Sequence, residues 1–397
     1  MAMLSLGFAP SFLTRAAAAA SPRRRLLIAI FQRGAVDGLN MVVPYGEADY
    51  YSLRPSIAIA KPGSADASLD LDGFFGLHPR MAPLVPLWEN SVLAVVHACG
   101  SADQTRSHFD AQDYMETATP GVKSTRDGWL NRYLQAAGGD QSPLRGVAVA
   151  RQMPRSLKGR APSLAVGSVE SFDVQGGMGA ERALETAYAG AANPLLSSSA
   201  QAAFEAMRTL RTASSGPYQP AAGVEYPRSP FGQALQEIAR IAKADVGLEI
   251  AFAESGNWDH HVGEGGATGQ LAQRLDDLAH GLAALAADLG ERMSDTVILT
   301  MSEFGRAAAE NGNRGTDHGH GNAMLLIGGP VKGKKVYGRW PGLREHQRFE
   351  GRDLAVTTDF RDVFSEVATR HLSLTPEALG QVFPRYTAAT PLGIIRV

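Results

Sequence analysis

The chain has 397 residues, of which 44% are hydrophobic and 20% are charged, a balance typical of a globular protein with one large or two ordinary domains. Its formal net charge of −2 gives no reason to expect a nucleic acid or an anionic membrane surface as a partner. The single cysteine, Cys99, excludes an internal disulfide and a thiolate metal cluster. Its apolar flanks predict a buried residue at the end of a strand.

The first 22 residues are predicted to be an export signal. They begin MAMLSLGFAPSFLTRAAAAA, an apolar run that ends in small residues resembling a cleavage region. Pro10 and Arg15 interrupt the run, which makes it too short for a membrane span. A basic region before it is missing, which suggests a truncated twin-arginine signal. We therefore expect a periplasmic or otherwise exported protein without a membrane span in its mature form.

Further along the chain, short apolar runs alternate with segments of helical periodicity. The predicted strands lie at 23–31, 91–100, 248–254, 296–301 and 323–329, and the predicted helices at 109–118, 268–293 and 360–372. This alternation predicts an α/β fold with a mostly parallel sheet flanked by helices on both faces. We expect 23–397 to form a single domain. The stretch 151–230, rich in Ala, Ser, Gly and Pro, is predicted to be a helical insertion or cap.

Polar side chains follow four of the predicted strands. Asp37 follows the first, the segment 105–108 the second, NWDHH (257–261) the third, and Glu303 the fourth. Ligands bind beyond the carboxyl ends of parallel strands, so these groups are expected at one edge of the sheet. GTDHGHGN (315–322) precedes a strand, and we expect it to reach this edge as a loop that its glycines make flexible.

Carboxylates and imidazoles gathered without thiolates favour zinc, manganese or iron(II) over magnesium or calcium. There are enough candidates for two divalent ions, which together can hold the attacking and leaving oxygens of a phosphoryl transfer. Of the adjacent His260 and His261, we expect one to bind. The candidate metal ligands are Asp37, Asp259, His261, Glu303, Asp317, His318 and His320.

Three candidate catalytic residues stand directly before the first predicted helix, 109–118. The hydroxyl of Ser107 would gain from the helix dipole and would act as a nucleophile if a metal lowered its pKa. Ser107 could equally be an ordinary helix N-cap. Likewise, Asp37 could be a residue that caps the backbone of the DGLN turn. Arg106 could hold a phosphate or sulfate oxygen, and His108 either supports the site or simply begins the helix.

Several motifs resemble the exported bacterial domain-of-unknown-function family 1501 (DUF1501), among them FQRGAVDGLN, SHFDAQDYME, DGWLNRYL, MSEFGR and GTDHGHGNAMLLIGG. That family is similar to the alkaline-phosphatase-like superfamily. The resemblance implies an Asp after the first strand, a nucleophile at a helix start, and later Asp and His ligands. The positions in that order are Asp37, Ser107, Asp259 with His261, Glu303, and His318 with His320.

This chain departs from the superfamily pattern in two respects. Where the superfamily commonly carries an Asp-His pair after a late strand, the chain has SEFG, so either Glu303 or the pair Asp317-His318 would take that role. The sulfatase signature, Cys or Ser followed by x-Pro-x-Arg, is absent. The sequence therefore favours a metal-dependent hydrolase of phosphate esters, less so of sulfate esters, acting on a small-molecule or glycan substrate in the cell envelope. A non-catalytic exported protein that binds an anion, a glycan or a protein is one alternative, and a phosphomutase-like enzyme is another.

Overall fold

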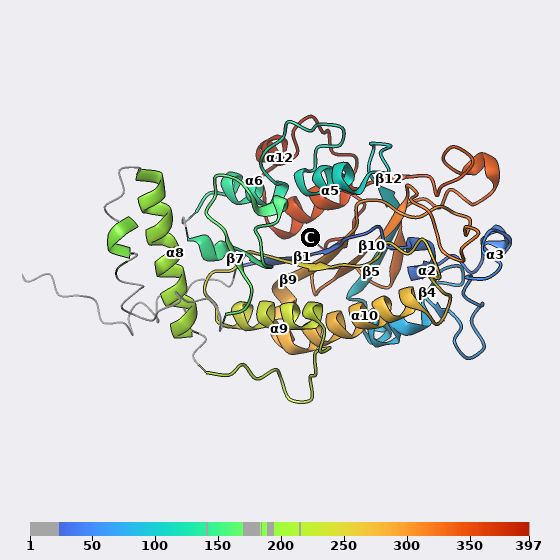
Figure 1. Ribbon diagram of the computed structural model, residues 1–397, viewed down its shortest axis with the longest axis horizontal. Helices are drawn as coiled ribbons and strands as arrows, with labels where there is room; N and C mark the ends of the chain where they lie inside the picture. Colours follow the sequence, from blue (N-terminus) through green and yellow to red (C-terminus); the bar gives the residue numbers. More distant parts are fainter. Residues whose placement is uncertain are drawn as a thin grey trace, which may run out of the picture.

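The computed structural model describes residues 24–139, 142–169, 183, 185–188, 194–213 and 216–396. The expected export signal at 1–22 lies outside these residues. The described chain forms three layers, a central sheet with a layer of helices on each side (Figure 1). Within the described residues, no helix is both long and apolar enough to cross a membrane.

The main sheet has nine strands in the described residues, in the order β11-β5-β10-β9-β1-β8-β6-β7, with β12 pairing with β5. All of its strand pairs are parallel except those of β10, which runs antiparallel to both β5 and β9. The predicted mostly parallel α/β architecture is therefore confirmed. The strands are β1 (Leu26–Gln32), β5 (Leu93–Gly100), β6 (Gly146–Val149), β7 (Leu164–Val166), β8 (Ile250–Ser255), β9 (Thr296–Met301), β10 (Asn322–Ile327), β11 (Lys335–Tyr337) and β12 (Thr358–Asp359).

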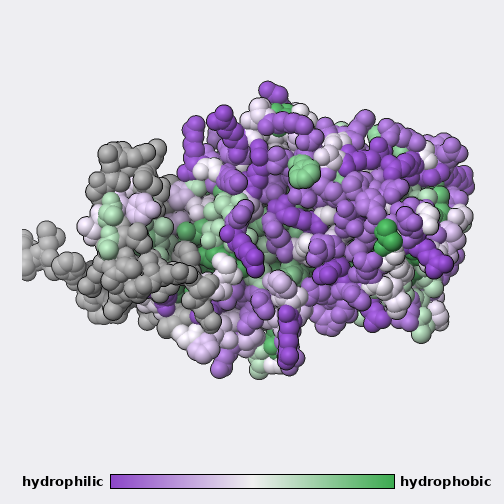
Figure 2. Space-filling model, viewed as in Figure 1, coloured by the Kyte–Doolittle hydropathy of each residue, from purple (hydrophilic) through white to green (hydrophobic). Residues whose placement is uncertain are grey.

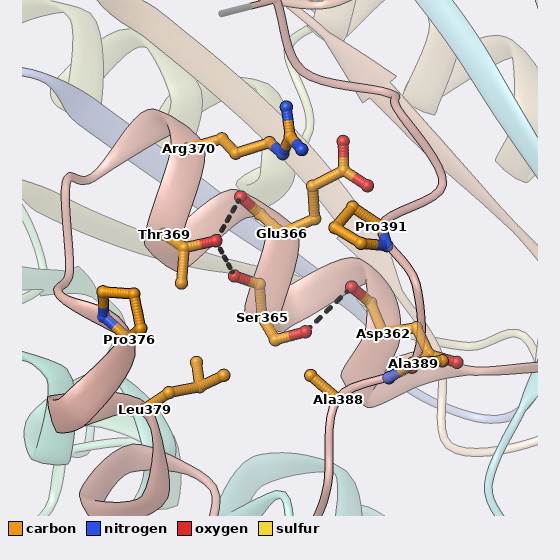
Figure 3. A pocket seen from close by; sticks show the side chains of 10 residues that line it. All are labelled: Asp362, Ser365, Glu366, Thr369, Arg370, Pro376, Leu379, Ala388, Ala389 and Pro391. Atoms are coloured by element: carbon orange, nitrogen blue, oxygen red, sulfur yellow. Dashed lines mark hydrogen bonds between the residues drawn. The ribbon is translucent and has the colours of Figure 1, made fainter.

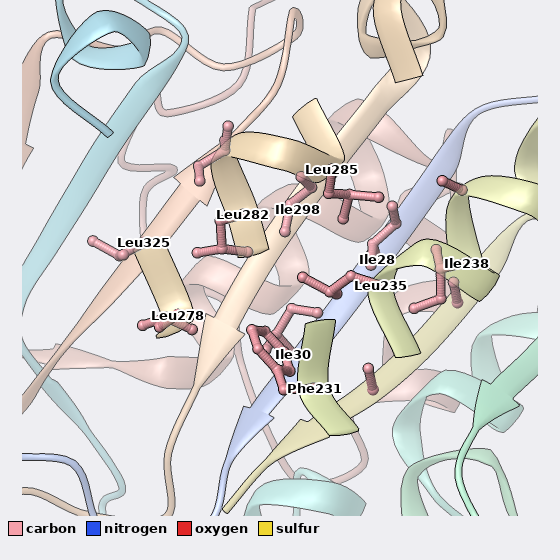
Figure 4. Close-up of a cluster of buried hydrophobic side chains, with 14 of the residues drawn as sticks. Ile28, Ile30, Phe231, Leu235, Ile238, Leu278, Leu282, Leu285, Ile298 and Leu325 are labelled. Atoms are coloured by element: carbon pink, nitrogen blue, oxygen red, sulfur yellow. The ribbon is translucent and has the colours of Figure 1, made fainter. Parts of the chain in front are cut away.

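Successive side chains of the central strands pack alternately into two hydrophobic cores, one on each face of the sheet. In β1, Ile28 and Ile30 pack with leucines of α9 (Pro230–Lys243) and α10 (Gln270–Leu289), as Figure 4 shows. Their neighbours Leu27, Ala29 and Phe31 face the opposite layer. Because successive side chains of a strand point to opposite faces, an unbroken apolar run such as LLIAIF is what a strand covered on both sides requires.

The second layer is built from α5 (His108–Thr117), α6 (Trp129–Ala136), α11 (Phe360–Glu366) and α12 (Pro376–Val382). Trp129 of α6 stacks on Phe364 of α11, with ring centroids 4.5 Å apart. The single helix predicted at 360–372 consists of two parts. The α-helix α11 ends at Glu366 and continues as a π-helical turn, η6 (Val367–His371).

The shorter elements complete the described fold. Within the described residues, a small antiparallel sheet has the order β2-β4-β3. The remaining elements are β2 (Val42–Val43), β3 (Leu69–Asp70), β4 (Gly76–Leu77), α2 (Gly38–Met41), α3 (Ala48–Leu53), α4 (Val85–Glu89), η1 (Pro79–Leu84), η2 (Pro143–Arg145), η3 (Arg155–Leu157), η4 (Gly290–Asp295) and η5 (Glu345–Gln347).

The stretch 151–230, expected as a helical insertion, contains both a strand and a helix. β7 extends the main sheet by pairing in parallel with β6, for example Val147 with Leu164. The helix α8 (Pro194–Ala213) stands beyond β7 at one end of the molecule (Figure 1). Part of this stretch is therefore an integral edge of the sheet.

The direction of β10 decides what lies at the carboxyl edge of the sheet. β1, β5, β8 and β9 all end at this edge, since β5 and β9 are both antiparallel to β10. β10 runs the other way, so it begins there, at Asn322. The loop 315–321, which precedes β10, therefore lies at the edge where the other polar segments follow their strands.

Candidate metal centre

Three histidines and one aspartate from distant parts of the chain meet at this edge. His108 is the first residue of α5, Asp259 and His261 follow β8, and His318 lies in the loop before β10. The Nε2 atom of His318 is 3.0 Å from Nε2 of His108 and 3.0 Å from Nε2 of His261. Carboxylate oxygens of Asp259 lie 3.0 Å, 3.3 Å and 3.5 Å from the Nε2 atoms of His261, His318 and His108 respectively.

The far nitrogen of each ring identifies which atom faces the centre. The Nδ1 atom of His108 is 2.8 Å from a Glu303 oxygen, that of His261 is 3.2 Å from an Asp317 oxygen, and that of His318 is 2.8 Å from the Arg106 carbonyl oxygen. An ionised carboxylate or a carbonyl only accepts hydrogen bonds, so each Nδ1 carries the proton. The Nε2 atom of each ring therefore faces the centre, where those of His108 and His261 both lie beside Nε2 of His318 and all three lie near Asp259.

Nitrogen lone pairs and a carboxylate repel one another at these distances unless a positive charge lies between them. A proton on one ring can hold one of these contacts, whereas a divalent ion satisfies all of them together. Ligands about 2.0–2.1 Å from a tetrahedral zinc ion lie about 3.3 Å from one another. The ligand atoms of His108, His318 and Asp259 lie 3.0 to 3.5 Å apart, which fits this value, and these three form the group whose atoms all lie within 4.8 Å of one another. His261 adjoins this group through His318 and Asp259, at 3.0 Å from each. Donors of nitrogen and oxygen without sulfur suit zinc, manganese or iron(II).

Glu303 lies behind His108 and does not touch the other rings of the centre. Its side chain is fully buried and accepts hydrogen bonds from His108, from the side chain of Gln112 (2.8 Å) and from the backbone N–H of Gly34 (2.9 Å). Burial by itself would raise the pKa of Glu303, but these hydrogen bonds outweigh it and the pKa lies below its usual value. The hydrogen bond to Glu303 in turn raises the pKa of His108. Glu303 therefore orients His108, as partners of metal-binding histidines commonly do.

Arg306 joins the two loops that carry Asp259, His261 and His318 to the loop that follows β1. Its buried guanidinium donates to the carbonyl of Ala35 (2.7 Å), to those of Trp258 and Thr316 (both 3.1 Å), and to Asp259 (2.6 Å). Partial burial would raise the pKa of Asp259, but the hydrogen bond and charge of Arg306 hold it below the usual value. Asp259 is thus kept ionised and in position.

Two glycines of GTDHGHGN allow close backbone packing, a role that we did not expect from the sequence. A β-carbon at Gly315 would lie 2.4 Å from the His261 backbone, and one at Gly319 would lie 2.2 Å from the carbonyl carbon of Arg306. Neither glycine has a positive φ, so neither is needed for an unusual backbone conformation. Only a residue without a side chain lets the loop lie this close to its neighbours.

Two other predicted metal ligands lie apart from the four groups that meet. The Asp37 carboxylate forms a salt bridge with buried Arg54 and also accepts from the backbone N–H of Leu39, so it caps the short helix α2. Burial would raise the pKa of Asp37, but Arg54 holds it below the usual value. His320 is buried against the ring of Phe349, with centroids 4.5 Å apart, and burial lowers its pKa.

Asp317 contacts the back of His261 and does not reach the shared centre. Its Oδ1 also accepts from the side-chain amide of Asn311 at 3.1 Å, and this bond chiefly lowers the pKa of Asp317. Of the adjacent histidines 260 and 261, the structure places His261 in the group. His260 is buried, and desolvation lowers its pKa to about 4.

The three candidate catalytic residues have different surroundings. Ser107 occupies the N-cap position of α5 but forms no capping hydrogen bond, and it is exposed. Arg106 binds the fully buried Asp353 through its Nε (3.0 Å) and also Glu350 (2.7 Å), so its guanidinium is already engaged by carboxylates. His108 belongs to the group of side chains that could hold a metal ion, a place that the sequence did not predict for it.

Sequence reasoning also missed Arg306 and Gln112. Arg306 carries one signal in the sequence, since it is a lone charged residue in the small, apolar run GRAAA after a strand. Gln112 lies one helical turn after His108, so its side chain shares that face of α5 and reaches the same carboxylate. Gln112 bonds to Glu303 and Arg306 bonds to Asp259, and no sequence pattern near these residues indicates either contact.

A separate hollow of about 540 Å³ lies between α11, η6, α12 and the C-terminal segment (Figure 3). Its carboxylates are already bound to that segment. Asp362 accepts from the Tyr386 hydroxyl and from the N–H of Ala389, and Glu366 accepts from the N–H groups of Gly393 and Ile395. This hollow therefore holds the C-terminal segment in place and offers no free ligand group comparable to the centre at the sheet edge.

A family model described as "Protein of unknown function (DUF1501)" matches residues 91–383. No protein with a curated description matches the sequence. Among solved structures, the chain is similar to the C-terminal periplasmic domain of EcEptC from Escherichia coli in complex with Zn, with 12% identity, a TM-score of 0.43, and coverage of 94% of this chain and 89% of that one. It is also similar to PsFucS1 sulfatase from Pseudoalteromonas sp., with 13% identity, a TM-score of 0.33, and coverage of 91% and 70%. At these values, a function has to be argued from the centre itself.

Proposed function

Because the family model matches most of the chain, the protein belongs to the DUF1501 family of unknown function, and we propose that it is a metal-dependent hydrolase of phosphate esters, less so of sulfate esters. The observation that carries this proposal is the meeting of three imidazole Nε2 atoms with one carboxylate, at spacings that fit a bound ion. His108, His261, His318 and Asp259 would hold the ion. Within the described residues, His108, Asp259 and His318 are the one group whose possible ligand atoms all lie within 4.8 Å of one another, and His261 adjoins it. We therefore propose a single ion here, where the number of candidate ligands suggested two.

The residues around the centre supply what an ester hydrolase needs besides the ion. A divalent ion would polarise the ester and lower the pKa of a nearby hydroxyl or water. Ser107 stands next to the ligand His108, and its hydroxyl is exposed and free of a capping bond. The N–H of Ser107 donates to the Thr105 hydroxyl, and the first intrahelical bond of α5 runs from Ala111 N–H to the Ser107 carbonyl. The N–H groups of residues 108–110 at the amino end of the helix are therefore the ones that an anion would use. These features support Ser107 as nucleophile, with an activated water as the alternative.

An anionic ester also has to be attracted to the centre by positive charge. Arg306 is shielded behind Asp259, and Arg106 is bound to two carboxylates, so neither faces a substrate directly. Attraction of an anionic ester therefore rests on the ion and on the amino end of α5. The predicted signal at 1–22 leads us to place this activity in the periplasm or elsewhere outside the cytoplasm, where a phosphomutase acting on cytosolic metabolites would not work.

The first test is the metal content of the purified protein by elemental analysis, beside the variant His318→Ala. We expect one transition-metal ion per chain in the wild type and much less in the variant. His280→Ala is the matched control, because His280 is exposed on α10 and bonds to its own helix. A protein that stays metal-free after incubation with zinc and manganese would contradict the proposal.

The second test is turnover of 4-nitrophenyl phosphate and 4-nitrophenyl sulfate by the metal-loaded protein. We expect the phosphate to be the better substrate. Ser107→Ala abolishes turnover if the serine is the nucleophile, and leaves a residual rate if water is. A metal-loaded protein that turns over neither ester would favour the non-catalytic alternative, in which the same centre binds an anion.

A further inference from the structure

Two exposed apolar side chains border the candidate metal centre. Phe109 is 89% exposed and directly follows the ligand His108, and Val262 is 61% exposed and directly follows the ligand His261. Consecutive α-carbons are about 3.8 Å apart, so each apolar side chain begins one residue away from a metal ligand. Because both histidine Nε2 atoms lie 3.0 Å from that of His318, the two apolar residues are the chain neighbours of two side chains that meet at one centre.

The centre opens to solvent on the side where these residues stand. The side chains of Asp259 and His261 are 43% and 39% exposed, whereas Glu303 and Arg306 behind them are almost fully buried. Ser107, the proposed nucleophile, is exposed beside Phe109. Phe109 and Val262 are therefore exposed apolar residues beside the polar groups that a substrate has to reach.

Large exposed hydrophobic side chains are few elsewhere on the described surface. The face shown in Figure 2 is largely hydrophilic, with apolar areas that are small and separate. Within the described residues, the one other large hydrophobic side chain that is exposed is Tyr188, on the segment tied to α8 by the Glu185–Arg208 ion pair. Single exposed apolar residues are ordinary, whereas Phe109 and Val262 adjoin two histidines of one centre along the chain.

We infer that the substrate is amphiphilic, with an anionic ester head at the metal centre and an apolar alkyl or aryl group lying on Phe109 and Val262. This inference rests on the proposed function, since it takes the ester head as the group at the centre. It assigns these two residues the role of selecting the apolar part of the substrate. Burial of each methylene against such a surface is worth about a two- to fourfold gain in affinity.

The test uses n-alkylphosphonates from methyl to octyl, which keep the anionic head but cannot be hydrolysed. Their affinities for the zinc-loaded protein are measured by titration calorimetry, so the readout does not depend on turnover. We expect affinity to rise about two- to fourfold per methylene over the first several carbons. The double variant Phe109→Ser/Val262→Ser should weaken octylphosphonate about tenfold and change methylphosphonate less than about twofold.

Tyr188→Ser is the matched control and should leave both affinities unchanged. Equal affinities for methyl- and octylphosphonate would overturn the inference while leaving the anion-binding centre intact, and so would an equal loss of octylphosphonate affinity in Tyr188→Ser. If no phosphonate of any length binds, the proposed ester site fails and the inference fails with it. All three substituted positions are exposed, so the variants are expected to fold.

Discussion

The Nε2 atoms of His108 and His318 lie 3.0 Å apart, although 210 positions separate the two residues in the sequence. Each histidine is fixed from behind by a group that only accepts hydrogen bonds, Glu303 for one and the Arg106 carbonyl for the other. The two lone pairs are therefore held face to face by the fold. This contact is what makes the sheet edge a candidate metal centre and what the following predictions probe.

Glu303→Gln is expected to weaken metal binding about 10- to 100-fold, because the buried carboxylate orients His108 and makes its ring a stronger ligand. The dissociation constant for zinc would be measured by competition with a chelator. Glu254→Gln is the control, since Glu254 pairs with Arg33 and contacts no histidine of the centre. Equal affinities for Glu303→Gln and wild type would show that His108 is oriented by other contacts.

Arg306→Met is expected to lower the free energy of unfolding by about 3 kcal/mol or more. The substitution leaves buried carbonyl oxygens of three loops without their donor, and each such loss typically costs about 1–3 kcal/mol. Urea denaturation of the metal-free proteins would measure the change. Arg314→Met, at an exposed position of the same region, should change stability by less than about 0.5 kcal/mol. Similar stabilities of the two variants would refute the joining role of Arg306.

Gly319→Ala is expected to destabilise the loop and reduce metal binding. The added methyl group would lie 2.2 Å from the carbonyl carbon of Arg306, so the backbone of one segment has to move, at a cost of about 1–3 kcal/mol. Gly312→Ala is a control in the same connection, since a β-carbon there meets no atom within 4 Å. Thermal denaturation and zinc content would be measured for both. A neutral Gly319→Ala would mean that the loop tolerates displacement.

Stability should fall as the pH drops from about 6.5 towards 4, in part through His97. This ring is buried, its Nδ1 accepts from the N–H of Ala98 and its Nε2–H donates to the Val42 carbonyl, and desolvation lowers its pKa to about 4. The unfolded chain takes up the proton near pH 6.5, before the folded chain does, so acid favours unfolding. The stabilisation is complete above pH 6.5 and is lost as the pH falls to 4, by up to about 3 kcal/mol for this group.

Denaturation with chelator present, at pH 7 and pH 4.5, would measure this loss without a contribution from metal release. His97→Gln cannot take up a proton, so its stability should depend less on pH than that of the wild type, whatever its stability at pH 7. An unchanged difference between the two pH values in the variant would exclude His97 as a source of the acid sensitivity.

Much of the architecture could be predicted from the sequence because it depends on local patterns. The apolar runs at β1, β5, β8 and β9 predict strands covered on both faces, and each was found within a few residues of the expected range. Cys99 is buried at the end of β5, as its flanks predicted. The direction of β10 was not predictable, because an apolar run does not say which way a strand enters the sheet.

The sequence by itself determined which residue types come to the carboxyl edge, since the ends of parallel strands must meet there. Only the tertiary structure decided which of them meet. Asp37 and Glu303 both follow strands, yet Arg54 neutralises the first and His108 engages the second, while His108 itself faces His318. Such choices depend on side chains from distant segments competing for the same carboxylate, and that competition is settled by distance in the folded chain, which no local pattern records.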